Sequence, residues 1–309
     1  MSQAKKSKLP KRALHGWLNI DKPYEMGSTD VVRQIKKMLR PVKVGHAGTL
    51  DPLASGILPI ALGEATKTIP FMQDAGKTYQ FVVKWGEATT TDDAEGEVCE
   101  RSDIRPGKQA IEEALPAFTG VIQQIPPAYS AIKVNGKRAY DMARAGETVE
   151  LQARSVHITS FRLLSCEADE ARFEVECGKG TYIRSLARDV AQKLGTCGHV
   201  TFLRRVRVGK FTEKTAISLD LLEQIMHSVA TSEPEGLEEV VLSPATALDD
   251  IPAIAVDEAG SRRIRHGQTL TTHKPLKYGQ SVALMWDGKL LAIGQWDGSH
   301  IKPKRVLNY

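Results

Sequence analysis

The sequence predicts an α+β protein that ends in a small all-β module. Residues 172–177 alternate charged and apolar side chains, a pattern typical of a half-buried strand. Apolar residues at helical spacing follow over residues 183–194. Closer to the C-terminus, Asp287 and Gly288 separate two apolar runs, which is a strong signal for a β-hairpin. A chain of 309 residues has room for about two domains and a substantial core.

The first elements along the chain are a basic arm, a strand and a helix. Residues 1–13 predict a flexible arm, because they contain five basic residues and no acidic one. Residues 18–22 predict a short strand, and Ser28 or Thr29 can cap the helix that follows. Further along, the pattern predicts a short helix at 64–72, a strand at 79–84, a polar and acidic loop at 87–98, and a helix at 111–118.

The last helix of the large domain is predicted to begin after Ser218 and to end near residue 230. Residues 231–247 are rich in Ser, Glu, Pro and Gly and predict a linker. We therefore expect a large domain over residues 14–247 and the all-β module over residues 248–309.

Charge is distributed unevenly along the chain. The net charge is +5, and residues 251–309 carry nine Lys and Arg against four Asp and Glu. Residues 215–250 instead carry eight acidic residues and no Lys or Arg. Segregated basic regions suggest a polyanionic partner such as nucleic acid. On charge alone, a solvated surface with a disordered basic tail explains the pattern equally well.

Several classes of protein are disfavoured by composition. No apolar run approaches the roughly 18 residues of a membrane span, and the basic N-terminus lacks the apolar segment of a secretory signal. None of the four cysteines forms a Cys-x-x-Cys pair or lies at zinc-ligand spacing from a histidine. We therefore expect neither disulfides nor a metal site, and a cytoplasmic protein.

The most informative segment is residues 45–56, which holds one carboxylate, Asp51, in an irregular loop. Glycines at 45, 48 and 56 allow unusual backbone angles, and Pro52 biases Asp51 toward extended geometry. The apolar run at 57–62 anchors the loop in buried structure. A rigidly held carboxylate suits a nucleophile or a general base. The alternative is a turn aspartate that bonds its own backbone.

This loop resembles the catalytic motif G-H-x-G-x-L-D-P-x-A-x-G of the pseudouridine synthases that modify the T-arm of tRNA. Eight specified positions match, namely Gly45, His46, Gly48, Leu50, Asp51, Pro52, Ala54 and Gly56. Three further segments resemble the family in the same order, at 58–67, 178–186 and 202–207. The resemblance implies the pseudouridine synthase fold, with a mixed, mainly antiparallel sheet, and a C-terminal RNA-binding barrel of the PUA type.

The resemblance also implies an activity and a site. The expected reaction isomerises uridine 55 in the T-loop of tRNA without guide RNA, cofactor, metal or protein partner, and we expect a monomer. Asp51 would be the nucleophile, and Arg184 would pair with it, keep it ionised and orient it. Tyr79, in a Lys-x-Tyr segment, would stack on the flipped uracil and take part in proton transfer. His46 would fill the space that the flipped nucleotide leaves. The remaining residues expected to bind substrate are Lys22, Tyr182 and Leu203.

Each of these residues also has an ordinary structural explanation. Without the resemblance, Arg184 would be a surface arginine, Tyr79 a core aromatic and His46 a loop histidine. Residues 123–150 interleave basic and aromatic side chains, as RNA-binding surfaces do, but a proline-broken hairpin would look the same. In the family, this segment is an insertion that grips the tRNA arm.

One position departs from the family pattern. The early motif is usually Asp-Lys-Pro-x-Gly, but Glu25 stands here where glycine is expected. That change leaves the conformation of residues 24–28 open. Two rival functions also remain open, namely a guided synthase that acts on other RNA and a non-catalytic RNA-binding protein on the same scaffold. The Leu58-Pro59-Ile60 continuation argues against the first rival, and the presence of both Asp51 and Arg184 argues against the second.

Overall fold

The structure is a computed structural model that describes residues 11–309 except 131, 135 and 229–235. The strands of the large domain are β1 (Gly16–Lys22), β2 (Val44–His46), β3 (Ala54–Leu62), β4 (Lys77–Trp85), β5 (Glu87–Thr89), β6 (Val98–Arg101), β7 (Gly120–Gln124), β8 (Lys133–Val134), β9 (Lys137–Arg138), β10 (Arg154–Cys166), β11 (Glu170–Cys177), β12 (Gly198–Val208) and β13 (Phe211–Thr212). The C-terminal strands are β14 (Ala253–Ala255), β15 (Ser281–Trp286), β16 (Lys289–Trp296) and β17 (Ile301–Val306).

The helices are α1 (Ser28–Leu39), α2 (Ile69–Asp74), α3 (Lys108–Ala114), α4 (Ala139–Arg144), α5 (Ile183–Lys193), α6 (Leu219–Ser228), α7 (Leu237–Val240) and α8 (Glu258–Arg265). Four short 3₁₀ segments are η1 (Gly63–Thr68), η2 (Leu115–Phe118), η3 (Glu213–Thr215) and η4 (Pro244–Leu248). The predicted helix at 64–72 is thus η1 followed by α2, and the one at 111–118 is α3 followed by η2.

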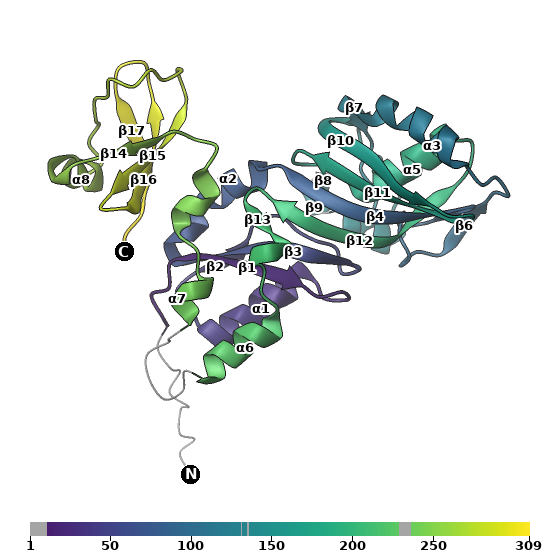
Figure 1. Cartoon of the computed structure of the whole chain (residues 1–309), viewed down its shortest axis with the longest axis horizontal. Helices are drawn as coiled ribbons and strands as arrows, with labels where there is room; N and C mark the ends of the chain where they lie inside the picture. Colours follow the sequence, from purple (N-terminus) through teal and green to yellow (C-terminus); the bar gives the residue numbers. More distant parts are fainter. Residues whose placement is uncertain (1–10, 131, 135, 229–235) are drawn as a thin grey trace, which may run out of the picture.

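One nine-stranded sheet forms the centre of the large domain (Figure 1). Its order is β1-β3-β12-β4-β11-β10-β7, with β2 added to β3 and β13 to β12. Among the described strands of this sheet, the β3–β12 pair alone is parallel. The mixed, mainly antiparallel sheet implied by the resemblance is therefore confirmed.

Amphipathic helices bury the apolar surface of this sheet. Helix α1 turns Val31, Ile35 and Leu39 into the core, and α5 does the same with Leu186 and Val190. Burying a side chain of this size stabilises the fold by about 1.5–3 kcal/mol, so such rows hold both helices in place. The start of α5 and the central strands β3, β4 and β12 provide a rigid frame for the loop around Asp51.

The capping prediction for α1 is wrong. The residue before the helix is Gly27, and no side chain caps its N-terminus. Ser28 is buried and exchanges two hydrogen bonds with the backbone of Leu50, its hydroxyl donating to the carbonyl and accepting from the N–H, at 2.8 Å each. The hydroxyl stabilises the fold more by bonding the buried backbone groups of Leu50 than it would by capping the helix, because water can satisfy the exposed helix end. Ser28 thereby fixes the residue next to Asp51.

The predicted linker is also wrong where the structure describes it, over residues 236–247. Leu237 is buried in the main core, and Ala247 is buried in a second cluster with Trp17. Trp17 and Leu242 exchange backbone hydrogen bonds of 2.8 Å in both directions. Residues 231–235 of the prediction lie outside the described residues. The segment that leads to the C-terminal module is therefore packed against the large domain.

The C-terminal module contains a four-stranded sheet in the order β14-β15-β16-β17, accompanied by α8 (Figure 1). The predicted hairpin is confirmed, with Asp287 and Gly288 at φ values of 48° and 69° between β15 and β16. Closure into a PUA-type barrel stays a prediction. Leu248, Leu290 and Leu307 of this part bury a cluster that also contacts Phe71 of α2. The module is thus attached to the large domain through an apolar contact.

Glu25, at the position where the family pattern has glycine, adopts a left-handed backbone conformation of the kind that favours glycine. Its φ is 63°, in the left-handed region, and its side chain is exposed. This conformation costs a residue with a Cβ roughly 1–2 kcal/mol.

We expect Glu25→Gly to raise the free energy of unfolding by about 1 kcal/mol, measured by urea denaturation. Glycine removes the backbone strain, but part of that gain is offset because glycine makes the unfolded chain more flexible. Glu25→Ala keeps the Cβ and should give no gain. An equal gain from both variants would contradict the strain explanation.

Candidate active site

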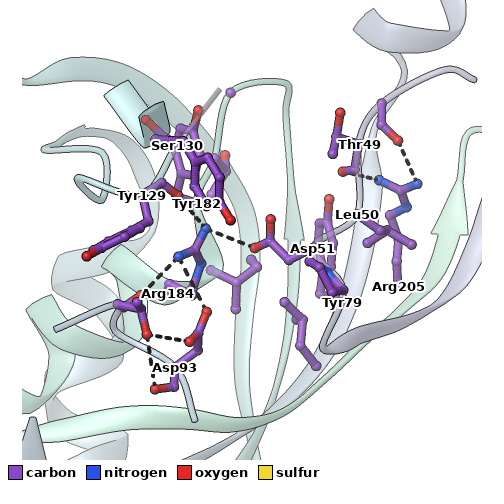
Figure 2. A pocket seen from close by; sticks show the side chains of 18 of the residues that line it. Thr49, Leu50, Asp51, Tyr79, Asp93, Tyr129, Ser130, Tyr182, Arg184 and Arg205 are labelled. Carbon is purple, nitrogen blue, oxygen red and sulfur yellow. Dashed lines mark hydrogen bonds and ion pairs between the residues drawn. The ribbon is translucent and has the colours of Figure 1, made fainter. Parts of the chain in front are cut away.

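A cavity of about 1050 Å³ opens beside the Asp51 loop (Figure 2). Its walls come from segments that are far apart in the sequence. These are the loop itself, β4, the predicted acidic loop, the insertion at 123–150, the start of α5 and β12. Five of the predicted site residues line it, namely Asp51, Tyr79, Tyr182, Arg184 and Leu203.

Asp51 presents its carboxylate to this cavity, and 41% of its side chain is exposed. The loop around it is held by local contacts, including a backbone hydrogen bond of 3.0 Å from the Ala54 N–H to the Asp51 carbonyl. Gly48 has a φ of 101°, a conformation open to glycine but unfavourable for other residues. Together with the bonds from Ser28 to Leu50, these features fix the position of the carboxylate.

Arg184 lies at the start of α5 and is almost completely buried, with 7% of its side chain exposed. One terminal nitrogen lies 3.0 Å from the Asp51 carboxylate, and the other lies 3.4 Å from that of Asp93. The guanidinium also donates to the backbone carbonyls of Thr91 and Tyr129 at 2.9 Å each. A planar guanidinium that contacts four acceptors has a fixed orientation, and one of its terminal nitrogens faces the Asp51 carboxylate.

Asp93 was missed in the sequence, where it appeared only as part of a polar loop. Its carboxylate is buried, accepts from the Thr91 hydroxyl at 2.5 Å and accepts from the Glu95 N–H at 3.0 Å. These bonds hold it against Arg184, so one buried cation is shared by two carboxylates. The run of Thr and Asp at 89–93 was the available signal, but no local pattern connects it with residue 184.

Arg205 was also missed as a site residue, although it belongs to the segment at 202–207. It is 1% exposed and lines the cavity. Its guanidinium donates to the carbonyl of Ile57 at 2.7 Å and to those of Gly48 and Thr49 at 3.2 and 3.5 Å. These acceptors flank Asp51 on both sides in the sequence. Arg205 therefore fastens both ends of the loop to β12.

Tyr79 and Leu203 lie on neighbouring strands beneath the loop. In the β12–β4 register Leu203 is opposite Phe81, and Tyr79 is opposite Arg205. Figure 2 shows Asp51 between Arg184 on one side and Tyr79 on the other. Burial is the main effect on the Tyr79 phenol and raises its pKa. The phenol is therefore protonated at neutral pH.

Lys22 lies close to the loop segment and His46 belongs to it, but neither residue lines the cavity. The Lys22 ammonium is buried and donates to the carbonyls of Pro23 at 2.9 Å and Pro52 at 3.2 Å. Burial lowers the pKa of Lys22 to about 8, against the opposing effect of Asp51. Burial, and next the charge of Arg205, lower the pKa of His46. In this structure Lys22 supports the backbone beside Asp51, and substrate contacts by both residues stay predictions.

The insertion at 123–150 forms one wall of the cavity. Tyr129, Ser130, Tyr140 and Arg144 line it, and Arg144 lies over the Tyr140 ring at 4.7 Å from its centroid. Because the Tyr129 carbonyl accepts from Arg184, the insertion is connected directly to the buried cation. Interleaved aromatic and basic side chains thus line the same cavity as the Asp51 carboxylate. Within the described residues, no cluster of His, Cys, Asp or Glu could hold a metal ion.

We expect Ser28→Ala to destabilise the protein and slow its reaction without removing any group that lines the cavity. The variant leaves the buried backbone N–H and carbonyl of Leu50 without their partner, which costs about 1–3 kcal/mol. Urea denaturation and single-turnover rates would measure both effects. Ser218→Ala removes a serine whose hydroxyl accepts from an exposed backbone N–H. This control should cost less stability and leave the rate unchanged, whereas equal effects would contradict a positioning role for Ser28.

Comparison with known proteins gives the family to which the chain is similar. Residues 36–183 match the family described as TruB family pseudouridylate synthase (N terminal domain). Residues 184–249 match the tRNA pseudouridylate synthase B C-terminal domain, and residues 252–307 match the domain named Pseudouridine synthase II TruB, C-terminal. The family matches therefore cover most of the chain.

Two curated relatives are similar over nearly their whole length. The chain is 51% identical to tRNA pseudouridine synthase B of Bradyrhizobium diazoefficiens, over 96% of this chain and 87% of the relative. It is 48% identical to the protein of the same name from Rhodospirillum rubrum, over 96% and 97%.

Two solved structures share the fold. One is described as the structure of an H/ACA RNP bound to a substrate RNA containing 2′-deoxyuridine, with a TM-score of 0.76 and 26% identity over 96% of this chain and 86% of that one. The other is a Cbf5-Nop10-Gar1 complex, with a TM-score of 0.76 and 28% identity over 94% and 84%. Asp51 lies in a loop that matches the synthase motif and pairs with Arg184 of α5, and the relatives are about 50% identical along the chain; this chain therefore belongs to the TruB family of pseudouridylate synthases.

Proposed function

We propose that this protein isomerises uridine 55 in the T-loop of tRNA to pseudouridine, without a guide RNA. The observation that carries the proposal is the pairing of Asp51, open to a large cavity, with a buried and fully engaged Arg184. A protein that only binds RNA has no need to bury a cation against a carboxylate, because burying charge is costly unless it is paired. The names and high identity of the curated relatives support tRNA as the substrate.

The proposed reaction needs no external reactant. The N1–C1′ bond of the uridine breaks, the base turns, and a C5–C1′ bond forms while a proton leaves C5 and N1 gains one. The atoms of product and substrate are the same, so neither an oxidant nor a cofactor is consumed. Asp51 acts as the nucleophile in this scheme, and Arg184 pairs with it and aims it into the cavity. One reactive carboxylate suffices, in contrast to the pair that a glycosidase uses to admit water.

The substrate uridine must leave its stacked position to reach this cavity. Flipping a base costs a few kcal/mol, and one aromatic stacking contact returns about 1–3 kcal/mol. In the proposal, the Tyr79 ring stacks on the flipped uracil and Leu203 packs the pocket beneath it. Because burial keeps the phenol protonated, Tyr79 suits stacking or proton donation better than the role of a general base. Tyr182, His46 and phosphate contacts supply the remaining stabilisation.

The T-arm is proposed to lie along the insertion at 123–150, with the C-terminal module contacting phosphates. Arg144 over Tyr140 offers a charged and aromatic surface at the cavity wall. The protein acts as a monomer in the cytoplasm in this proposal. Among the described residues, no helix is long and apolar enough to cross a membrane.

The proposal is tested by incubating the purified protein with an unmodified tRNA transcript and no other RNA. Pseudouridine leaves the mass unchanged, so carbodiimide labelling would detect it and map its position. We expect one modified position, at residue 55, and none in a transcript that carries cytidine there. A guided synthase is the main alternative, since one solved structure of the same fold is described as an H/ACA RNP. Lack of product without a guide RNA would favour that alternative.

A further inference from the structure

A second cavity, of about 380 Å³, lies where the end of α1, strand β2 and the η1–α2 segment meet. It shares no lining residue with the catalytic cavity. Its lining includes Lys11, Lys36 and Lys43 and no acidic residue. Lys11 precedes β1, Lys36 belongs to α1 and Lys43 precedes β2. The fold therefore brings three ammonium groups from different segments of the chain to one cavity.

The positive charge at this cavity has no counter-charge within the described part of the chain. All three lysines are exposed, and none of them forms an ion pair there, whereas Lys67, Lys84 and Lys179 each pair with a carboxylate. The dipole of α1 favours basic residues in its last turn. That effect explains Lys36 and its neighbour Lys37 alike, but only Lys36 lines the cavity. It does not explain Lys43 or Lys11.

Two arginines are bonded through their backbones to the segment that lines the cavity. Arg12 and Arg40 are tied together by a 2.9 Å backbone hydrogen bond, and Val42, which lines the cavity, donates to the Arg12 carbonyl at 3.2 Å. Each guanidinium has one terminal nitrogen that is buried without a hydrogen-bond partner among the described residues. A buried donor without an acceptor costs about 1–3 kcal/mol. Neither arginine lines the cavity, so the cations around it are Lys11, Lys36 and Lys43, and three ammonium groups call for an anion that offers several acceptor oxygens.

The cavity is close to the catalytic loop in the sequence. Gly45 lines the second cavity and Gly48 lines the first, so their Cα atoms are at most about 11 Å apart along the chain. A nucleic acid bound at Asp51 carries a phosphate at every nucleotide, and it extends beyond one flipped base in both directions. Its backbone can therefore reach the second cavity while the reacting uridine occupies the first.

We propose that this second cavity binds a backbone phosphate of the tRNA whose uridine occupies the catalytic cavity. The inference rests on the proposed function for the identity of the RNA. Lys36 and Lys43, which both line the cavity, hold the phosphate, and Lys11 adds to the positive environment. Such a contact positions the RNA without reading its sequence. It affects binding and its salt dependence, and leaves the chemical step alone.

The test compares the double variant Lys36→Gln, Lys43→Gln with Lys37→Gln. Lys37 is also exposed and adjacent to Lys36 on α1, but does not line the cavity. Binding of unmodified tRNA would be measured from 50 to 200 mM salt, with single-turnover rates at saturating tRNA. We expect the slope of log K against log salt to become shallower by about 1 for each lost phosphate contact. Lys37→Gln should keep the wild-type slope, and all rates should stay within about twofold, because one phosphate contact positions the RNA rather than reacting with it.

An isolated T-arm hairpin, measured in parallel, locates the phosphate. If the double variant has a shallower salt slope with both RNAs, the contacted phosphate lies in the T-arm. If its slope is shallower with full tRNA alone, the phosphate lies elsewhere in the tRNA. An unchanged slope with both RNAs would overturn the proposal, as would an equal change in Lys37→Gln. Wild-type turnover without guide RNA is scored separately, so failure of the proposed function is not confused with failure of the phosphate site.

Discussion

Asp51→Asn is expected to reduce pseudouridine formation by on the order of 10⁴-fold or more while leaving tRNA binding intact. The amide keeps the shape of the side chain but removes the charge and the nucleophilic oxygen. Arg184 retains Asp93 and two backbone carbonyls as partners, so the buried cation keeps a counter-charge in the variant. The effect should therefore appear in the chemical step and not in folding.

Single-turnover labelling with saturating tRNA measures the rate, and filter binding measures the affinity. Asp103→Asn is a matched control, because Asp103 is exposed and does not line the cavity. It should behave as the wild type in both assays. A rate for Asp51→Asn within tenfold of the wild type would remove Asp51 from the role of nucleophile.

Arg184→Lys is expected to lower the single-turnover rate by about 10²-fold or more, with little change in tRNA affinity, because one misplaced group can cost that much in rate. Lysine keeps the positive charge but not the planar fork that now contacts Asp51, Asp93 and two carbonyls. A single ammonium cannot satisfy these acceptors from the same position. Asp51 would then keep a positive neighbour but lose its fixed orientation.

Arg188→Lys on the same helix provides the control for this prediction. Arg188 pairs with Asp92 and Asp189 one turn further along α5 and does not line the cavity. Its replacement should affect stability more than rate. If Arg184→Lys instead weakened tRNA binding and left the rate of bound tRNA unchanged, Arg184 would be a phosphate contact. Thermal unfolding of both variants would separate a misfolded protein from a misaligned site.

Much of the local structure was predictable because it depends on neighbours in the sequence. The alternation at 172–177 specifies β11, the helical spacing after it specifies α5, and Asp287-Gly288 specifies the last hairpin. The loop that holds Asp51 was predictable from its glycines and proline, although both ends of the predicted segment 45–56 belong to strands, β2 and β3. The contact between Asp51 and Arg184 was implied by resemblance alone, and the structure contains it at 3.0 Å.

Other features follow only from the way the chain closes on itself. The bond of Arg184 to Thr91 spans 93 residues, and that of Arg205 to Ile57 spans 148. Periodicity describes which face of an element is buried, but not which distant backbone lies against it. For that reason Asp93, Arg205 and the second cavity were not found from the sequence, and the predicted linker proved to be packed structure.

The sequence by itself predicted several of the elements, the reactive loop and the family pattern, since these depend on side chains close together in the chain. The tertiary structure alone decided how the loop is held. Ser28 could equally have capped α1, but the buried backbone of Leu50 offered it two partners, and a buried unmet hydrogen bond costs more than a solvated one. Glu25 likewise takes the conformation that the turn requires, because the packing on either side outweighs the strain of one residue.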